Sequence, residues 1–480
     1  MQLSSTRITA LKRPLKKAQN FFKDPYPRNK ELIFEKYELD FPDIKFTYSV
    51  AGSQYESVVN IGLPVVTLAV LNGSDHHSLF VNLGLSFATA HFLLSDFETV
   101  NCACAKLNER EIQLLEAQLQ ESLTEFRYLQ GLDPSRPIRV VSSGTVPLQA
   151  VDFPEVEDKA LMLNGGGKDS CVSAELLKRI KLPFAWLNAH PLATRDRVIA
   201  QSGVEENYSV DFWIDSKVKN DAVYDWGVKP YLYTILSSSL IVAYLNGFKY
   251  LVTGAEHSAD DPNLIYKGIA VNHQVGKTFT FEQFFNEFCS QSVLQGAEVF
   301  SIARPFTDLR LAEMFSQFRE YFGAFFSCNV GMGTDVWCNS CHKCAFTWLA
   351  FYPFFEKQEL EAIFGENLFE ITAIRRSIVE LTTASIKPWE CVGTQEESKL
   401  ALYYCLRKSP EMEFKEWPMR SDLEEACAGL DEKEAYTNTL SSFLTPHNIP
   451  SQYEEALRHT AQELLEKSID RWPDVIRVQA

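Results

Sequence analysis

Hydrophobic and polar residues alternate with a period of two over residues 32–70, which is typical of strands with one buried and one wet face. Two stretches with a helical period follow, at 83–97 and 109–128. Pro and Ser residues at 134–144 indicate a linker. The pattern therefore predicts a small N-terminal α+β domain over residues 31–150.

Short apolar runs alternate with helical stretches through the middle of the chain. The runs lie at 160–163, 184–187, 210–214 and 250–253, and each has the length of a buried strand. Strands that alternate with helices form parallel sheets, whose ligands gather where the strands end. We therefore expect a catalytic α/β domain over residues 151–356.

The chain becomes helix-rich and polar from residue 357 to residue 480. The stretch 453–465 shows this clearly, because its apolar side chains fall on one side of a helix. We recognise no chemical motif there and expect a helical C-terminal region with a packing role. The whole pattern predicts an α/β fold in which a central parallel sheet is flanked by the N-terminal domain and this helical region.

The composition of the 480 residues, 46% hydrophobic and 23% charged, is that of a globular protein. No apolar run approaches the ~20 residues of a membrane helix, so we expect a cytoplasmic protein with no membrane partner. The net charge of −17 argues against general binding of nucleic acid. A basic arm over residues 1–30 carries +7 and begins faintly like an organelle transit peptide, although a peripheral or disordered arm fits it better.

A run of three glycines separates the apolar run at 160–163 from a helical stretch. We call residues 164–170 the glycine loop; it consists of Asn164, Gly165, Gly166, Gly167, Lys168, Asp169 and Ser170. Glycines let a phosphate approach the backbone, and the start of a helix offers free N–H groups and a positive dipole end. A Walker A loop would need Ser or Thr where Asp169 stands, and a dinucleotide fingerprint would need Gly where Ser170 stands. The glycine loop is therefore either another kind of anion-binding loop or a tight turn that binds no ligand.

Four cysteines within 17 residues form a cluster: Cys328, Cys338, Cys341 and Cys344. Their spacing lets the thiolates converge on one ion, and we favour a closed tetrahedral Zn²⁺ site. An iron–sulfur cluster or a set of free cysteines are the alternatives. The total of 11 cysteines is odd, which favours a reducing compartment over a disulfide scaffold.

Polar and titratable side chains are dense between residues 254 and 282, directly after the apolar run at 250–253. They include Glu256, His257, His273, Lys277 and Glu282. Each of them alone has an ordinary structural explanation. Their grouping on loops after a predicted strand is typical of a catalytic or binding site.

The glycine loop resembles the pyrophosphate loop of the PP-loop (HUP-like) ATP pyrophosphatases, usually Ser-Gly-Gly-x-Asp-Ser, with Asn164 in place of the first Ser. Further motifs resemble one family, the ATP-dependent UDP-N-acetylmuramoyl-L-alanyl-L-glutamate epimerases of bacterial cell-wall synthesis. They are Gly-x-Glu-x-Ser-Ala at 254–259, Asn-His-Gln-x-x-Lys at 272–277, and Trp337-Cys338-x-x-Cys341-x-Lys343-Cys344-x-Phe346. The chain departs from the family pattern at His257 and Asp260, where Arg and Asn are usual.

The resemblance implies an epimerase that uses ATP and Mg²⁺ and acts on a UDP-muramoyl dipeptide or a related carboxylate. The three glycines and Ser170 would bind pyrophosphate, Lys168 would add charge, and Asp169 would hold Mg²⁺. Arg304 and Lys277 would bind phosphate or carboxylate groups. The acid and the base would come from Glu256, His257, His273 and Glu282, among which the sequence does not choose.

Three rival functions stay open from the sequence. A ligase or synthase of the type that makes the cyano-deazaguanine precursor of queuosine shares the loop and the cysteines, but its activated carboxylate meets ammonia. A zinc-stabilised nucleotide sensor would bind ATP without chemistry. An RNA-modifying PP-loop enzyme is disfavoured, because the chain is acidic and has no basic stripe interleaved with aromatic residues.

Overall fold

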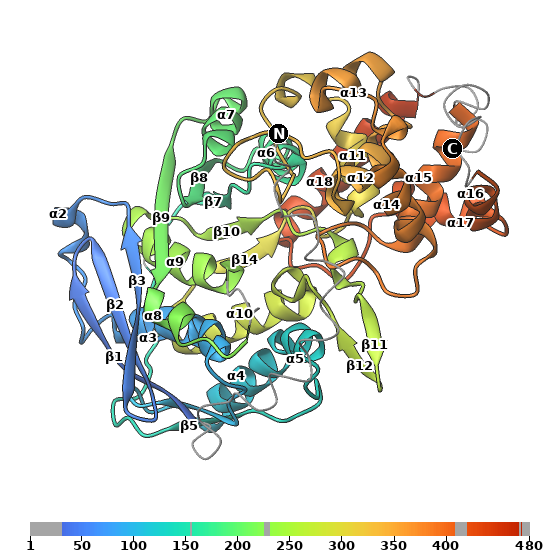
Figure 1. The fold of residues 1–480 in the computed structure, drawn as a ribbon. Coiled ribbons are helices and arrows are strands. Elements are labelled where there is room, and N and C mark those ends of the chain that lie inside the picture. Colours follow the sequence, from blue (N-terminus) through green and yellow to red (C-terminus); the bar gives the residue numbers. More distant parts are fainter. Residues whose placement is uncertain (1–30, 154–155, 225–230, 409–419, 470–471, 473–480) are drawn as a thin grey trace, which may run out of the picture.

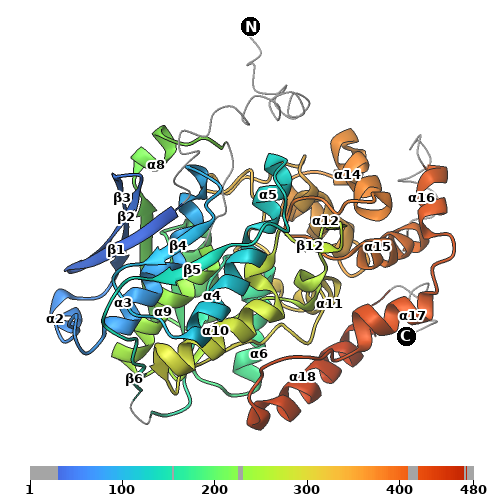
Figure 2. The same cartoon turned by 90° about the horizontal axis from the view of Figure 1, so that it is seen from below.

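The computed structural model describes residues 31–153, 156–224, 231–408, 420–469 and 472. The basic arm expected at 1–30 lies outside these described residues. Figures 1 and 2 show the chain from two directions at right angles, with the C-terminal helices gathered at one side. Within the described ranges, no helix combines the length and the apolarity needed to cross a bilayer.

Ten strands of the described chain form one mixed sheet. They are β1 (Glu31–Asp40), β2 (Asp43–Val50), β3 (Ser53–Ile61), β4 (Thr99–Cys102), β5 (Arg139–Ser142), β7 (Ala160–Leu163), β8 (Phe184–Ala189), β9 (Asn207–Ile214), β10 (Tyr250–Thr253) and β14 (Glu298–Ser301). Their order is β14-β10-β7-β8-β9-β3-β2-β1-β4-β5. The strands from β14 to β9 are parallel, the next three pairs are antiparallel, and β4 and β5 run parallel to β1. Two small sheets pair β6 (Val151–Asp152) with β13 (Leu294–Gln295) and β11 (Leu264–Tyr266) with β12 (Ile269–Val271).

Helices occupy both faces of the sheet and the C-terminal region. They are α2 (Val65–Leu68), α3 (His77–Ser86), α4 (Glu109–Ser122), α5 (Thr124–Gln130), α6 (Lys168–Arg179), α7 (Ala193–Ser202), α8 (Ser216–Asn220), α9 (Tyr231–Asn246), α10 (Phe279–Ser292), α11 (Asp308–Phe315), α12 (His342–Phe351), α13 (Lys357–Phe364), α14 (Thr372–Thr383), α15 (Gln395–Lys408), α16 (Arg420–Cys427), α17 (Glu432–Tyr436) and α18 (Ser451–Ile469). Shorter turns of helix are η3 (Ala88–Leu93), η4 (His257–Asp260), η5 (Val275–Lys277), η6 (Arg319–Tyr321), η7 (Leu368–Glu370) and η8 (Thr437–Ser441).

The two faces of the sheet bury two separate hydrophobic cores, because successive side chains of a strand point in opposite directions. On β7, Leu161 packs in one core, while Ala160 and Met162 pack in the other. Helices α3, α4, α9 and α10 cover the first face, and α4 and α10 lie side by side in Figure 2. Helices α6, α11 and α12 cover the second face. They share their core with the C-terminal helices.

The structure corrects the sequence prediction in three places. The parallel sheet is confirmed from β14 to β9, but it is half of a mixed sheet, because β9 pairs with the N-terminal strand β3. The linker expected at 134–144 was wrong, since residues 139–142 form the edge strand β5. The helix expected at 83–97 is replaced by α3, which ends at Ser86, and by η3. The short elements β5 and η3 show no periodic pattern of hydrophobic residues, so the sequence does not predict them. The domain boundaries stay a prediction.

Gly84 of α3 faces the ring of Phe34 on β1 so closely that a Cβ atom would overlap it. Gly84→Ala should therefore lower the free energy of unfolding by about 1–3 kcal/mol through overpacking, although Ala is the better helix former. Denaturant unfolding followed by circular dichroism measures this. Gly323→Ala is the matched control, because a Cβ atom there meets nothing within 4 Å; equal effects in both variants would contradict the packing.

Candidate active site and cysteine cluster

The ends of four neighbouring parallel strands form the edge at which the candidate site lies. Strands β14, β10, β7 and β8 lie in this order, and the glycine loop follows β7. The loop that begins at Gly254 follows β10, and a Cβ atom on Gly254 would lie 3.3 Å from the carbonyl oxygen of Asp169. The prediction that both loops begin at strand ends is confirmed, and the two loops are in contact.

The glycine loop is held in shape by its own polar groups. The Gly165 N–H donates to Ser170 Oγ at 2.9 Å, and the Gly166 N–H donates to Asn164 Oδ1 at 3.0 Å. Gly166 has φ +77°, and a Cβ atom there would lie 3.0 Å from Thr194 Cγ2, so two constraints exclude a side chain. No side chain of the described residues caps the N-terminus of α6. This uncapped helix end and the bare backbone fit an anion such as a phosphate.

A cluster of buried charges lies beside the glycine loop. The Lys168 ammonium forms ion pairs with Asp169 and with Asp308, the first residue of α11, and Lys168 is 5% exposed. The Lys277 ammonium lies 3.7 Å from Glu256 Oε2. Glu256 is 1% exposed, and within the described chain this oxygen has no hydrogen-bond partner. Three carboxyl groups and two ammonium groups therefore share one region, which we call the charge cluster. Lys168, Asp308 and Glu256 are buried in it, whereas Asp169 and Lys277 are half-buried.

The pKa values in the charge cluster follow from burial and from neighbouring charge. Burial lowers the pKa of Lys168, but the Asp169 and Asp308 carboxylates raise it by more, so the lysine keeps its proton. Burial raises the pKa of Asp169, but the ammonium groups of Lys168 and Lys277 reverse this and lower it. Burial raises the pKa of Asp308 to about 7 against the opposing effect of Lys168. At neutral pH Asp169 is therefore charged, whereas Asp308 is close to its titration point.

Arg304 is 1% exposed, and its guanidinium contacts the backbone of the site. It donates to the carbonyl oxygen of Glu256 at 3.0 Å and to that of Lys277, and it lies 3.4 Å from Asp260 Oδ2. The arginine therefore fixes two loops that carry predicted site residues. Its expected contact with a phosphate or carboxylate ligand stays a prediction.

Two of the predicted proton carriers, the buried Glu282 and the half-buried His257, lie near Arg304. Glu282, in the first turn of α10, accepts hydrogen bonds from the Ser301 N–H at 3.1 Å and from the Asn448 side chain at 2.9 Å. Burial raises the pKa of Glu282 to about 7. Burial lowers the pKa of His257, whose Nδ1 has no partner among the described residues. Near pH 7 Glu282 is therefore partly protonated and His257 is neutral.

The fourth candidate, His273, joins three distant parts of the chain. Its Nδ1 lies 2.8 Å from Glu125 Oε1 on α5, and its ring also interacts electrostatically with the Cys391 thiol. Burial lowers the pKa of His273, but these two partners outweigh burial and raise it to about 10. The imidazole of His273 therefore keeps its proton and is an imidazolium at neutral pH.

The four predicted metal ligands converge as expected. The Sγ atoms of Cys328, Cys338, Cys341 and Cys344 all lie within 4.8 Å of one another. Cys344 Sγ lies 3.7 Å from Cys338 Sγ and 3.6 Å from Cys341 Sγ. Thiolates bound about 2.3 Å from one tetrahedral ion stand roughly 3.8 Å apart, so these four can bind a single metal ion. His342 pairs with Glu380 and does not join the cluster.

Two family models match most of the chain. Residues 26–302 match the model described as the MurL N-terminal domain, and residues 324–436 match the MurL C-terminal domain. The chain belongs to the MurL family. This membership makes the chain an epimerase and confirms the resemblance found in the sequence.

Three relatives of this MurL chain are named UDP-N-acetyl-alpha-D-muramoyl-L-alanyl-L-glutamate epimerase. The one from Micromonospora sp. is 28% identical over 450 residues, which cover 88% of this chain and 97% of the relative. The one from Salinispora tropica is 29% identical over 450 residues, covering 88% and 93%. The one from Xanthomonas oryzae pv. oryzae is 28% identical over 371 residues, covering 72% and 78%. No solved structure shows a significant match.

Three residues of this MurL-family site were missed by sequence reasoning: Glu125, Asp308 and Cys391. Glu125 lies on a helix assigned to the N-terminal domain, and Cys391 stands alone in the C-terminal region, so neither has a motif around it. Asp308 comes after the short segment Glu298–Ser301, which forms β14 and has two apolar residues at its centre. The one available signal was this strand, because the loop that follows it lies at the same edge of the sheet as the other site loops.

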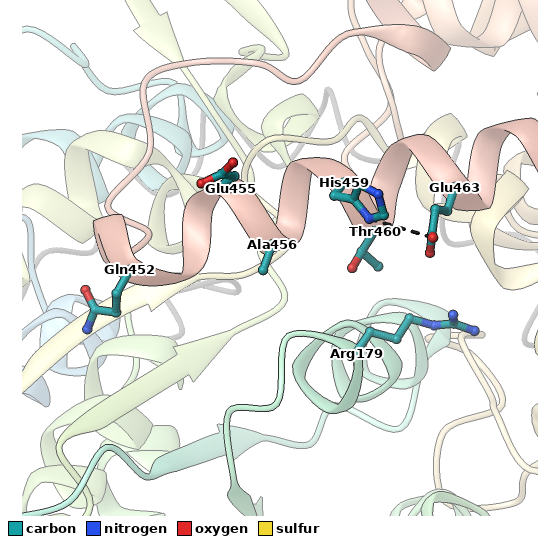
Figure 3. A pocket seen from close by; sticks show the side chains of 7 residues that line it. All are labelled: Arg179, Gln452, Glu455, Ala456, His459, Thr460 and Glu463. Atoms are coloured by element: carbon teal, nitrogen blue, oxygen red, sulfur yellow. Dashed lines mark ion pairs between the residues drawn. The ribbon is translucent and has the colours of Figure 1, made fainter.

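An open hollow of about 610 Å³ lies between α6 and α18 (Figure 3). Arg179 of α6 and several polar residues of α18, among them His459 and Glu463, line it. Arg179 is the last residue of α6, and the 12 residues of this helix span about 18 Å. The hollow therefore lies a helix length away from the glycine loop and is not part of the candidate active site.

We expect the purified protein to contain about one transition-metal ion per chain, measured by elemental analysis. Cys344→Ser should lose the ion and unfold at a lower temperature, because binding of the metal contributes to folding. Cys427→Ser is the control, since the Cys427 thiol contacts the Lys399 carbonyl oxygen at 3.7 Å instead of the cluster. Full metal content in Cys344→Ser would contradict the site.

The raised pKa of Glu282 predicts how the stability of the protein depends on pH. Its folded-state pKa of about 7 lies above the ordinary 4.5, so the stabilisation from its bound proton is complete below pH 4.5 and is lost as the pH rises through 7. Relative to the wild type, Glu282→Gln should therefore gain stability with rising pH, by at most about 3 kcal/mol. Urea unfolding at several pH values measures this, with Glu298→Gln on the exposed start of β14 as control. A pH-independent difference would refute the assignment.

Proposed function

We propose that the chain epimerises the terminal L-glutamate of UDP-N-acetylmuramoyl-L-alanyl-L-glutamate, or a closely related peptide, in the synthesis of peptidoglycan precursors. ATP would activate the α-carboxylate as an acyl-adenylate, releasing pyrophosphate and finally AMP. Family membership and the names of the relatives support the substrate. The observation that carries the ATP chemistry is the pairing of Lys168 with Asp169 and Asp308 beside a glycine loop and an uncapped helix end.

The chemical reason for activation is the negative charge next to the α-carbon. A base removes the α-proton with difficulty while the neighbouring carboxylate is charged, because a second negative charge would form beside the first. Joining a carboxylate oxygen to the α-phosphate of ATP cancels the charge and turns the carbonyl into an electron sink. The proton can then leave one face of the carbon and return on the other. Water finally cleaves the acyl bond and frees the D-epimer and AMP.

The groups around the glycine loop divide the work of binding ATP in this proposal. The three glycines and the start of α6 offer N–H groups to the leaving pyrophosphate. Asp169 and Asp308 would hold Mg²⁺, which prefers carboxylate oxygens and would neutralise phosphate charge. Lys168, now paired with these two carboxylates, would then pair with the phosphate instead. This exchange keeps every buried charge paired.

The groups around Lys277 divide the work on the substrate. The Lys277 ammonium stabilises negative charge that develops on the carbonyl oxygen of the activated glutamate. Arg304 holds the backbone of Lys277 and of Glu256 and so fixes both side chains. Glu256 keeps a buried carboxylate oxygen, with no hydrogen bond from the described residues, available to the substrate or to water.

We also propose that the ion in the cysteine cluster is zinc and that its role is structural. Four thiolates complete a tetrahedral shell, so no position is left for a substrate. The cluster lies at the start of α12, and a Cβ atom on Gly393 would be 2.6 Å from the ring of Phe346 on this helix. The metal therefore anchors a helix against which the segment around Gly393 packs closely.

Replacing Asp169 tests the proposal. With ATP, Mg²⁺ and the UDP-muramoyl dipeptide in D₂O, the wild type should release AMP and pyrophosphate and place deuterium on the glutamate α-carbon. Asp169→Asn should lower both rates at least about 100-fold, because a charged Mg²⁺ ligand is lost. Mass spectrometry and nucleotide chromatography measure the two products.

Asp215→Asn is the control for this substitution, because Asp215 caps the distant helix α8 by accepting the Lys217 N–H at 2.8 Å. Undiminished AMP release by Asp169→Asn would contradict the role of the loop. Release of AMP only with added ammonium, and without deuterium in the peptide, would instead identify a ligase.

A further inference from the structure

A histidine, a glutamate and a cysteine from three separate segments meet beside the charge cluster. His273 Nδ1 lies 2.8 Å from Glu125 Oε1. The next residue, Gln274, donates to the carbonyl oxygen of Val392, which follows Cys391 and so places the cysteine beside His273. The Lys277 ammonium, 3.7 Å from Glu256 Oε2, also interacts with the Cys391 thiol. The sulfur is therefore influenced by an imidazolium and by an ammonium group, and the ammonium group belongs to the charge cluster.

This environment distinguishes Cys391 from the buried cysteines of the core. Burial raises the pKa of Cys391, but the Lys277 ammonium and the hydrogen bond with His273 lower it to about 7, with help from Lys343. Burial raises the pKa of Cys289 well above its ordinary value. Cys391 is also partly exposed, whereas Cys289 is buried. Cys391 is therefore not sealed in the core, and the pKa of its thiol lies near neutral pH.

The segment that carries Cys391 is fixed against the site. The Gln274 side chain donates to the Val392 carbonyl oxygen at 3.4 Å. Asn263 exchanges two hydrogen bonds of 3.0 Å with the backbone of Lys387. The ring of Phe346 leaves no room for a side chain at Gly393. Contacts on both sides of Cys391 therefore hold its backbone in one place.

We propose that the Cys391 thiolate is the base that removes the α-proton of the activated glutamate, and that His273 and Glu125 are positioning residues that hold it. This inference rests on the function proposed above. It assigns the proton transfer to a residue outside the four candidates Glu256, His257, His273 and Glu282. His273 then acts through the thiol instead of touching the α-carbon.

The step balances without any further reagent. The thiolate sulfur bonds to the α-proton, the C–H electron pair moves into the acyl group, and the negative charge settles on the carbonyl oxygen near Lys277. A water molecule returns a proton to the opposite face, and Glu256 Oε2 is the acceptor that can orient this water. The resulting hydroxide takes the proton from the Cys391 thiol, which restores the thiolate.

Substituting Cys391 separates proton transfer from activation. Cys391→Ala and Cys391→Ser should lose deuterium incorporation from D₂O at least about 100-fold, which is the usual contribution of a positioned base. Dipeptide-dependent exchange of labelled pyrophosphate into ATP should stay within about threefold of the wild type, because it needs activation only. Cys427→Ala is the control and should leave both reactions unchanged. Wild-type deuterium incorporation in either Cys391 variant, or loss of both reactions together, would overturn the inference.

Alkylation of the unmodified protein gives a second test that needs no active-site variant. Iodoacetamide at pH 7 should modify Cys391 at least tenfold faster than Cys427, whose pKa burial raises to about 11. Peptide mapping by mass spectrometry measures both rates. His273→Asn should move the pH midpoint of Cys391 alkylation upward, which a purely structural role of His273 would not do. Equal rates for the two cysteines would contradict the assignment.

The two proposals fail differently. If the wild type exchanges no pyrophosphate and incorporates no deuterium with the dipeptide, the proposed function is wrong. If the wild type performs both reactions and the Cys391 variants do too, the function stands and the assignment of the base is wrong.

Discussion

The ion pairs that Lys168 forms with Asp169 and Asp308 constrain the whole candidate site. Removing a charge from water is costly, and a buried ion is tolerated only with partners close by. Lys168 begins α6 after β7, and Asp308 begins α11 after β14. The ion pair therefore requires that the two helix starts stand together at one edge of the sheet. Buried charges of this kind gather at functional sites, and this group is therefore central to the proposed ATP chemistry.

The order of the strands in the sheet brings the starts of α6 and α11 together. β7 and β14 both flank β10, so the loops after all three emerge side by side. Glycines at the contact points remove side chains that would hold the loops apart, as at Gly166 and Gly254. The N-terminal strands extend the same sheet and bring Glu125 to His273. The C-terminal helices share a core with α6 and bring Cys391 and Asn448 to the site. All three predicted regions thus contribute side chains to one centre.

The sequence predicted the features that depend on neighbours along the chain. Strand, glycine loop and helix follow one another within 160–180, and the cysteines of the metal cluster lie within 17 residues. Their chemistry is therefore readable without the fold. The grouping of Glu256, His273, Lys277 and Glu282 was visible for the same reason, although their partners were not.

The missed features depend on contacts between distant residues. The pairing of β3 with β9 is decided by packing across the sheet, and no local sequence pattern predicts it. Cys391 becomes a candidate base only because His273 and Lys277 lower the pKa of its thiol, and Asp308 matters only because it pairs with Lys168. The contacts of Arg304 with two backbone carbonyl oxygens and with Asp260 were not visible in the sequence, and its expected contact with a ligand stays a prediction. The type of a residue can be read from the sequence, whereas its role depends on the partners that the fold brings to it.

Transfer of an oxygen atom tests most directly whether the charge cluster serves to join a substrate carboxylate to ATP. The dipeptide can be prepared with ¹⁸O in the α-carboxylate of its glutamate and turned over with ATP and Mg²⁺. An acyl-adenylate that is opened at its carbonyl leaves one substrate oxygen on the phosphate, so mass spectrometry should find AMP with a single ¹⁸O. Epimerised peptide formed with unlabelled AMP, or without any AMP, would contradict the account.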